Sequence, residues 1–302
     1  MRSDGATAGL FDGVEGLHVE VKFLSLSSGS SGHCYFLGRF LEGRCLGGVL
    51  IDAGVSLRRL KTILSENGLS TEDFCAVLVT HDHMDHVRSL ASYCKKLSIP
   101  VWSSPEVIDA LRGRTLHLGD MGATLGKLAA GEWNEIGGFL VRFFVVPHDA
   151  TQTIGYAIRV PLSAESGETD EFYRFFIMTD AGRVTDEAVD FAKESETVVF
   201  ESNYDVDMLL GGPYPHDLKM RIMNGHGHLS NDECAAALRR FVHPGLRNIF
   251  LCHLSENNNT PRLAYEASRS VLDSLVSEGK IKEGAVSLRP LPRTSSSGLI
   301  VL

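Results

Sequence analysis

A run of metal-binding residue types directly after a short apolar segment is the feature that most constrains how this chain can fold. The segment Ala76–Thr80 is apolar and β-branched, which predicts a buried strand, and the six residues after it are His81-Asp82-His83-Met84-Asp85-His86. Residues two apart at the end of an extended strand project to the same side. His81 and His83 are therefore positioned to hold one metal ion together.

The second half of this run offers a second metal position. If the chain turns into a helix after the strand, Asp85 and His86 swing toward a point beside the first. Imidazole and carboxylate ligands together suit Zn²⁺, with Mn²⁺ or Fe²⁺ as alternative occupants. The other interpretation is an exposed polar loop between a strand and a helix. The density of histidine and aspartate in the run favours the metal site.

Three more metal-binding residue types each end an apolar strand: His148 follows 141–147, Asp180 follows 175–179, and His253 follows 249–252. In α/β folds, sites form at the carboxyl ends of strands, so we expect these side chains beside the run. The expected ligand sets are His81, His83 and His148 for one ion, and Asp85, His86 and His253 for the other, with Asp180 bridging. Such sets leave positions open for water, as a catalytic site requires.

The composition is that of a soluble globular protein, with 43% hydrophobic and 22% charged residues among 302. The net charge of -9 argues against a broad basic surface for nucleic acid, although it leaves room for a local basic groove. Strands and helices alternate without a Pro-rich linker. This pattern predicts one α/β domain over residues 17–302, after a flexible N-terminus of residues 1–16.

Hydrophobic periodicity and capping residues predict the order of the elements. The expected strands are 19–26, 34–40, 47–52, 76–80, 99–102, 139–146, 154–160, 172–178, 197–201 and 248–252. The expected helices are 57–66, 86–97, 105–111, 217–223, 231–241 and 260–278. A polar hairpin loop is expected at 163–170.

Cysteine use indicates a reducing compartment. The six cysteines include no Cys-x-x-Cys pair, and Cys75 and Cys252 lie in apolar runs, which predicts core residues rather than disulfides. No apolar stretch approaches the length of a membrane span, and residues 1–16 lack the apolar core of a secretory signal. We therefore expect a cytoplasmic protein without a membrane partner.

With these residues in place, the chain resembles the metallo-β-lactamase superfamily, whose signature is His-x-His-x-Asp-His followed by spaced His, Asp and His. The resemblance covers the chain from about Val19 to its end. It implies a four-layer αββα sandwich with the metals at one edge, between two sheets. Asp52, after the strand 47–51, matches the first motif of the family, where an aspartate supports the metal loop rather than binding metal. A plain turn residue is the compatible alternative.

Narrower motifs resemble the YycJ-type (WalJ-type) group within this superfamily. Ser25–His33 is similar to the Ser-Gly-Ser-Ser-Gly-Asn opening of that group, but His33 stands where the group usually has Asn. Five further stretches match in order: Pro147–Ala150, Thr179–Gly182, Glu201–Asp205, Gly227–Asn231 and His253–Asn258. The resemblance implies 5′-to-3′ exonuclease action on DNA and a habit of forming homodimers.

Two residues outside the ligand sets are candidate catalytic groups. In the similar ribonuclease Z pattern, the positions of Glu201 and His228 form a pair that steadies phosphate and protonates the leaving group. A surface carboxylate is the alternative for Glu201, and His226 is the alternative histidine. The same reasoning makes Asp85 a candidate to accept a hydrogen bond from the attacking water, in addition to its role as a ligand.

The candidate substrate contacts are in two polar loops. The Gly/Ser turn 27–32 offers backbone N–H groups and hydroxyls that can cradle phosphate, or it is simply a tight hairpin that needs glycine. We expect contacts from Ser30, Ser31 and His33 in this region, and from Asn257 after the last candidate ligand.

These features predict a phosphodiesterase that holds two divalent ions, Zn²⁺ or Mn²⁺ with iron as a further option, and cleaves nucleic acid through a metal-activated water. A 5′-to-3′ DNA exonuclease is the leading prediction, with DNA preferred over RNA. A hydrolase of the same fold acting on a small phosphodiester, such as a cyclic nucleotide, is the alternative. A thioester or lactam hydrolase ranks third, and a fold used only for binding is disfavoured by the complete ligand set.

Overall fold

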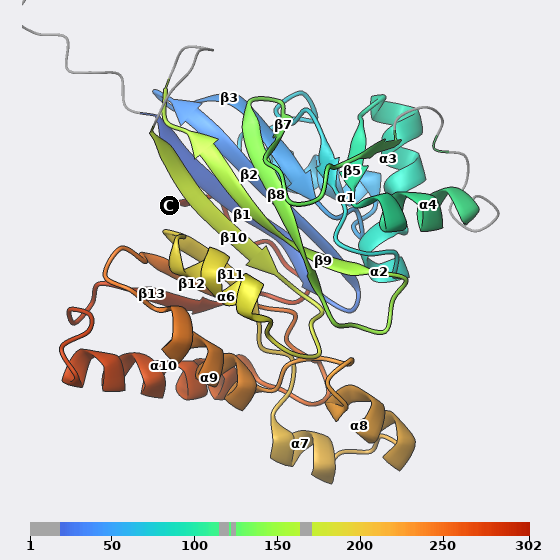
Figure 1. Cartoon of the computed structure of the whole chain (residues 1–302). Coiled ribbons are helices and arrows are strands. Elements are labelled where there is room, and N and C mark those ends of the chain that lie inside the picture. The colour runs from blue at the N-terminus through green and yellow to red at the C-terminus, as the bar shows by residue number, and fades with distance from the viewer. Residues whose placement is uncertain (1–18, 115–120, 122–124, 164–170) are drawn as a thin grey trace, which may run out of the picture.

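The computed structural model describes residues 19–114, 121, 125–163 and 171–302, which form two sheets with helices on both outer faces (Figure 1). The expected N-terminal segment 1–16 and nearly all of the expected loop 163–170 lie outside the described residues. The boundary at residue 17 therefore stays a prediction. Among the described residues, no helix has the length and apolar character needed to cross a membrane.

The first sheet has seven strands in the order β14-β1-β2-β3-β4-β5-β6. Antiparallel pairing joins β14, β1, β2 and β3, and parallel pairing joins β3, β4, β5 and β6. The strands are β1 (Glu20–Gly29), β2 (Gly32–Leu41), β3 (Arg44–Ile51), β4 (Val77–Leu78), β5 (Val101–Ser103), β6 (Leu125–Lys127) and β14 (Ile300–Val301).

The second sheet repeats this plan in the order β13-β12-β11-β10-β9-β8-β7. Its strands β7 to β10 pair antiparallel, and β10 to β13 pair parallel. The strands are β7 (Asn134–Ile136), β8 (Phe139–Val146), β9 (Thr153–Pro161), β10 (Phe172–Met178), β11 (Thr197–Glu201), β12 (Asn248–Cys252) and β13 (Ser287–Pro290).

Helices cover the outer face of each sheet. The helices around the first sheet are α1 (Leu57–Glu66), α2 (Met84–Val87), α3 (Leu90–Leu97) and α4 (Pro105–Gly113). Those of the second half are α6 (Asp186–Lys193), α7 (Val206–Gly211), α8 (His216–Met223), α9 (Asn231–Phe241) and α10 (Pro261–Ser277). In Figure 1, α7 and α8 stand apart from α6, α9 and α10, at the end of the molecule where α2 also lies.

Strand alternation creates three apolar layers between these elements. On β2, Tyr35 and Leu37 face the second sheet and join the central core, while Phe36 faces the first-sheet helices, because successive side chains point to opposite faces. A second outer core lies between the second sheet and α6, α9 and α10, around Phe176 and Leu238. Burial of each such side chain contributes about 1.5–3 kcal/mol. The four-layer αββα sandwich expected from the sequence is confirmed.

Two local expectations are wrong. The predicted helix 86–97 is divided into α2 and α3, because the backbone N–H of Ser89 donates to the carbonyl of Ala53 at 3.0 Å and pins the chain between the two helices. The predicted core residue Cys75 is exposed, since it precedes β4 at the sheet margin. Cys252 is buried as predicted, and all six cysteines are free thiols.

The carboxyl ends of parallel strands bring the candidate site residues to one edge. Asp52 follows β3, Asp180 follows β10 and His253 follows β12, and each has a left-handed backbone with φ of 62°, 54° and 54° respectively. This conformation costs a non-glycine residue about 1–3 kcal/mol and persists only where its surroundings enforce it. The strain is therefore concentrated where three strands turn their last side chains toward the same point.

Candidate metal centre

The first cluster consists of His81, His83 and His148, whose ring nitrogens lie within 4.8 Å of one another. Nε2 of His148 is 3.3 Å from Nδ1 of His83. Nδ1 of His148 lies 2.7 Å from the carbonyl oxygen of Gly227, which accepts its proton and leaves Nε2 with a free lone pair. The three expected ligands of one ion are thus brought together, although His148 comes from the opposite sheet.

Asp52 supports two of the candidate ligands from behind. Its Oδ2 lies 2.7 Å from Nδ1 of His86, and its carboxylate also accepts the hydroxyl proton of Thr80 at 2.9 Å. The Thr80 hydroxyl in turn accepts a hydrogen bond from Nδ1 of His81 at 3.0 Å. Both rings therefore carry their proton on Nδ1 and direct Nε2 into the site, which is how a carboxylate orients metal-binding histidines.

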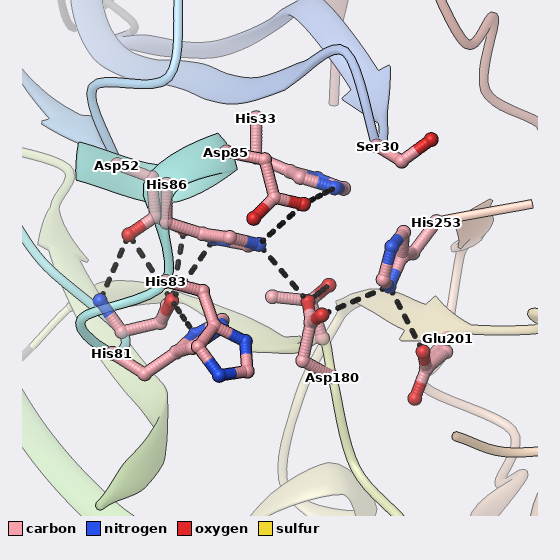
Figure 2. A network of polar contacts seen from close by, with 12 residues as sticks. Ser30, His33, Asp52, His81, His83, Asp85, His86, Asp180, Glu201 and His253 are labelled. Carbon is pink, nitrogen blue, oxygen red and sulfur yellow. Dashed lines mark hydrogen bonds and ion pairs between the residues drawn. The ribbon is translucent and has the colours of Figure 1, made fainter. Parts of the chain in front are cut away.

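Beside the first cluster lie two overlapping groups, His33 with Asp85 and His253, and His33 with His86 and Asp180 (Figure 2). We call His33, Asp85, His86 and His253 together the second cluster. Oδ2 of Asp85 is 3.9 Å from Nε2 of His86 and 4.0 Å from Nε2 of His33. Gly54 permits this meeting, because a Cβ at that position would lie 1.7 Å from the Asp85 carbonyl oxygen. The segments after β3 and around α2 can therefore approach only with glycine there.

Asp180 lies between the two clusters. Its Oδ2 is 3.3 Å from Nε2 of His86, and its Oδ1 is 3.2 Å from Nδ1 of His253 and 4.0 Å from Nε2 of His148. Burial alone would raise the pKa of Asp180, but His253 and His86 outweigh it and hold the pKa well below its usual value. The carboxylate is ionised and lies where a bridging ligand is expected.

Glu201 and His228 form a pair beside Asp180. Nδ1 of His228 is 2.8 Å from Oε1 of Glu201, whose Oε2 also accepts the Ala181 N–H at 2.7 Å. Burial would lower the pKa of His228, but the Glu201 carboxylate reverses this and raises the pKa to about 9. His226 is exposed. Of the two histidines left open by the sequence, the structure brings His228 to Glu201.

The donor set suits divalent cations. Nε2 atoms of His33 and His81 are buried without a hydrogen-bond partner among the described residues, and an unpaired buried donor or acceptor is costly. Burial lowers the pKa of His33, His81 and His148, which keeps these rings in the neutral form that binds metal. Burial also opposes protonation of His86, but Asp180 and Asp52 raise its pKa, so a cation would displace a proton there.

A cleft of about 240 Å³ opens onto residues of both clusters and onto His228. Ser30 lines it, whereas Ser31 and Asn257 are not among the described residues that do; Asn257 instead donates to the hydroxyl of Tyr214 at 3.0 Å. The described lining residues are Ser30, His83, Asp85, His148, Asp149, Asp180, Leu218, Arg221, Ile222, Gly227, His228 and His253.

Two groups in and around this centre were not anticipated from the sequence. Arg221 lies at the cleft rim and its Nε donates to Oδ2 of Asp149 at 2.6 Å. Tyr35, whose hydroxyl is 3.1 Å from Nδ1 of His33, lies two residues after it on the same strand. The alternation of β2 is the signal that could have linked Tyr35 with His33.

Comparison with known proteins agrees with this architecture and with the clusters. Residues 48–253 match the profile of the Beta-lactamase superfamily domain. The chain belongs to the metallo-β-lactamase superfamily. Within it, the chain is of the YycJ/WalJ type: it is 31% identical to Exodeoxyribonuclease YycJ of Bacillus anthracis over 260 residues, which are 85% of this chain and 90% of that relative.

Two further members of the superfamily are similar over most of their length. Exodeoxyribonuclease WalJ of Streptococcus pneumoniae is 29% identical over 255 residues, 82% of this chain and 86% of that relative. The solved metallo-β-lactamase fold protein YhfI of Bacillus subtilis superposes with a TM-score of 0.63 at 13% identity, covering 94% of this chain and 100% of that one. This metallo-β-lactamase superfamily member is a metal-dependent hydrolase, and its His/Asp clusters offer the ligand types that divalent cations take.

Proposed function

We propose that this hydrolase is a phosphodiesterase that uses two divalent ions to cleave nucleic acid, and that it acts as a 5′-to-3′ exonuclease on DNA. The observation that carries the proposal is the Glu201–His228 pair, 2.8 Å apart, in which His228 lines the cleft and Glu201 is fully buried. Hydrolysis of a lactam does not require such a pair, whereas a phosphodiester has a leaving oxygen that must be protonated. The names of the YycJ and WalJ relatives support the same reaction class.

Two cation positions fit the residues present. His81, His83 and His148 would hold one ion. Asp85, His86 and His253 would hold the other, with Asp180 between the two positions. When bound, such ions lower the pKa of water and neutralise charge on the phosphate oxygens. Zn²⁺ and Mn²⁺ both suit mixed imidazole and carboxylate ligands.

Side chains of the protein would then direct the proton transfers of the reaction. Asp85, which lines the cleft, would accept a hydrogen bond from the attacking water. His228 is protonated at neutral pH because Glu201 raises its pKa to about 9, so it can donate a proton to the leaving oxygen. The buried Glu201 would hold the imidazolium in place throughout.

Substrate binding would depend on local contacts, since the net charge is -9. Ser30 and Arg221 face the cleft from opposite elements, the β1–β2 turn and α8. The Ser30 hydroxyl would bond a phosphate oxygen, and Arg221 would pair with phosphate in place of Asp149. Contacts from Ser31 and Asn257 stay predictions. So do a preference for DNA over RNA, a homodimer and a cytoplasmic location.

The test is an incubation of the metal-loaded protein with 5′- and 3′-labelled DNA and RNA, single- and double-stranded, beside an Asp85→Ala control. Stepwise loss of nucleotides from the 5′ end of DNA, absent in the control, is the expected result. Cleavage of bis-p-nitrophenyl phosphate without cleavage of any polymer would favour the alternative, a small phosphodiester. The modest cleft of about 240 Å³ is the observation that keeps this alternative in view.

A further inference from the structure

His33 is a fully buried histidine whose outward-facing nitrogen has no partner. Its exposed fraction is 0%, and its Nε2 makes no hydrogen bond among the described residues. A buried polar atom left in this way costs roughly 1–3 kcal/mol. A bound group from outside the chain would give this nitrogen the partner that it lacks.

The other nitrogen of the ring is already engaged. Nδ1 of His33 lies 3.1 Å from the hydroxyl of Tyr35, which is 2.8 Å from Oγ of Ser28. Ser28 Oγ also accepts the backbone N–H of His253 at 3.0 Å. When Tyr35 accepts the Nδ1 proton, Nε2 carries a free lone pair. This arrangement resembles the support that Asp52 gives His86, with a hydroxyl in place of the carboxylate.

The free nitrogen faces the second cluster (Figure 2). The His33 ring stacks on His86, with centroids 4.2 Å apart and planes 11° from parallel, and it meets His253 edge-on at 4.5 Å. Its Nε2 is 4.0 Å from Oδ2 of Asp85. Ligand atoms about 2.1 Å from one zinc ion are about 3.4 Å apart in a tetrahedron, so a small inward shift brings these atoms to coordination distance.

We propose that His33 is an additional ligand of the second metal position, through Nε2, beside Asp85, His86 and His253. The inference rests on the two-ion site of the proposed function, but not on its substrate. It gives the second position a third imidazole. It also replaces the expectation of a substrate contact at His33, because this residue is not among the described residues that line the cleft, whereas Asp85 and His253 are.

The test measures metal binding rather than turnover. Zn²⁺ is titrated calorimetrically into the metal-free full-length protein and into His33→Asn, which carries the residue usual in the resembling group. We expect one of the two Zn²⁺-binding steps to lose at least about 10-fold in affinity in His33→Asn. Loss of a residue that only supports a ligand already lowers metal affinity by that factor. Ser30→Ala, in the turn that precedes β2 and on the cleft side, is the matched control and should bind Zn²⁺ like the wild type.

A second measurement covers the case in which His33→Asn does not fold. In wild-type protein with isotope-labelled histidine and NMR-active cadmium, one ring nitrogen of each of six histidines should show direct coupling to metal, with Nε2 of His33 among them. A His33 resonance without coupling, or unchanged Zn²⁺ affinity in His33→Asn, would overturn the inference. Absence of DNA cleavage would count only against the proposed function, since both metal readouts are independent of substrate.

Discussion

The two clusters differ in how the protein encloses them. The first consists of three imidazoles, and its His83 side chain is 32% exposed and lines the cleft. The second has a carboxylate of its own, Asp85, and the fully buried His33 and His86. Asp52 and Tyr35 contact its histidines from behind, whereas Nδ1 of His148 in the first cluster contacts the carbonyl of Gly227 and its Nε2 lies 3.3 Å from Asp149.

This difference assigns separate tasks to the two positions. A cation loses more water in an enclosed site, and negative ligands compensate for that loss, so the second position should hold its ion more tightly. The first position is open to the cleft, and Asp149, the carboxylate 3.3 Å from Nε2 of His148, is itself paired with the exposed Arg221, so this position is the better place for an exchangeable ion that contacts substrate. The predictions below test this division, from the largest expected effect to the smallest.

Removal of the Asp180 carboxylate, which lies between the two positions, should remove the difference in metal binding between them. In Asp180→Asn, both positions lose an anionic neighbour that is 3.3 Å from His86 and 4.0 Å from His148. Because metal charge stabilisation is worth several kcal/mol, kcat/KM should fall by about 1,000-fold or more. Metal analysis after gel filtration should show loss at both positions. If Asp180→Asn retained both ions and full activity, Asp180 would not be a ligand that the two positions share.

Loss of His228 should leave both clusters intact and still impair turnover. The side chain of His228 contacts Glu201 and is not one of the proposed metal ligands. His228→Ala should therefore retain its metal, while kcat falls about 100-fold. Steady-state kinetics and metal analysis on the same preparation check this. Lost metal would instead place His228 among the ligands, as its proximity to Asp180 at 4.0 Å allows.

Substitution of the support behind the rings should affect the enclosed position more than the open one. Asp52 contacts His86 directly at 2.7 Å and reaches His81 only through the Thr80 hydroxyl. Asp52→Asn should therefore weaken one binding step by about 10–100-fold and the other by less. Calorimetric titration resolves the two steps. Equal weakening of both would mean that the two positions share their support.

The alkaline limb of the pH dependence of kcat should report the protonation of His228 beside Glu201, and not the protonation of the metal ligands. His228 has a pKa raised to about 9, so its proton is present below that pH and is lost as pH rises through it. Nearby cations oppose a positive imidazolium, so the alkaline limb of kcat should lie at or below about 9. In Glu201→Gln the limb should move to lower pH, because the carboxylate that raises the pKa is gone. A limb at the same pH in that variant would exclude His228 as its source.

The smallest effect is expected at the cleft rim. Arg221 is 63% exposed and pairs with Asp149, so its interaction with phosphate is screened by solvent. Arg221→Ala should raise KM for DNA a few-fold, with kcat and both metal affinities unchanged. The effect should shrink as salt is raised, because screening weakens the contact in the wild type as well. A large fall in kcat would place Arg221 in the chemistry.

Much of the fold and of the candidate centre could be predicted from local pattern. The run His81–His86 follows a β-branched segment, and the apolar strands before His148, Asp180 and His253 alternate or are continuously buried, so periodicity locates each residue at a strand end. Parallel strands share an edge, which is why residues far apart in sequence could be assigned to one site. The helix α6 escaped notice although Thr185 caps it, because its eight residues carry a short apolar stripe.

Other features depend on contacts between distant segments, which local pattern does not encode. The sequence alone determined the residue types at the strand ends and the order of the main elements, because these follow from side-chain period and capping. The four-layer sandwich was expected from the resemblance to the metallo-β-lactamase superfamily and not from these patterns. Only the tertiary structure decided that helix 86–97 is divided by Ala53, that Cys75 is exposed, and that His33 is buried with its free nitrogen facing Asp85. Burial and hydrogen-bond satisfaction are properties of the packed chain, so a histidine in a glycine-rich turn could be placed at the metal centre only once both sheets were assembled around it.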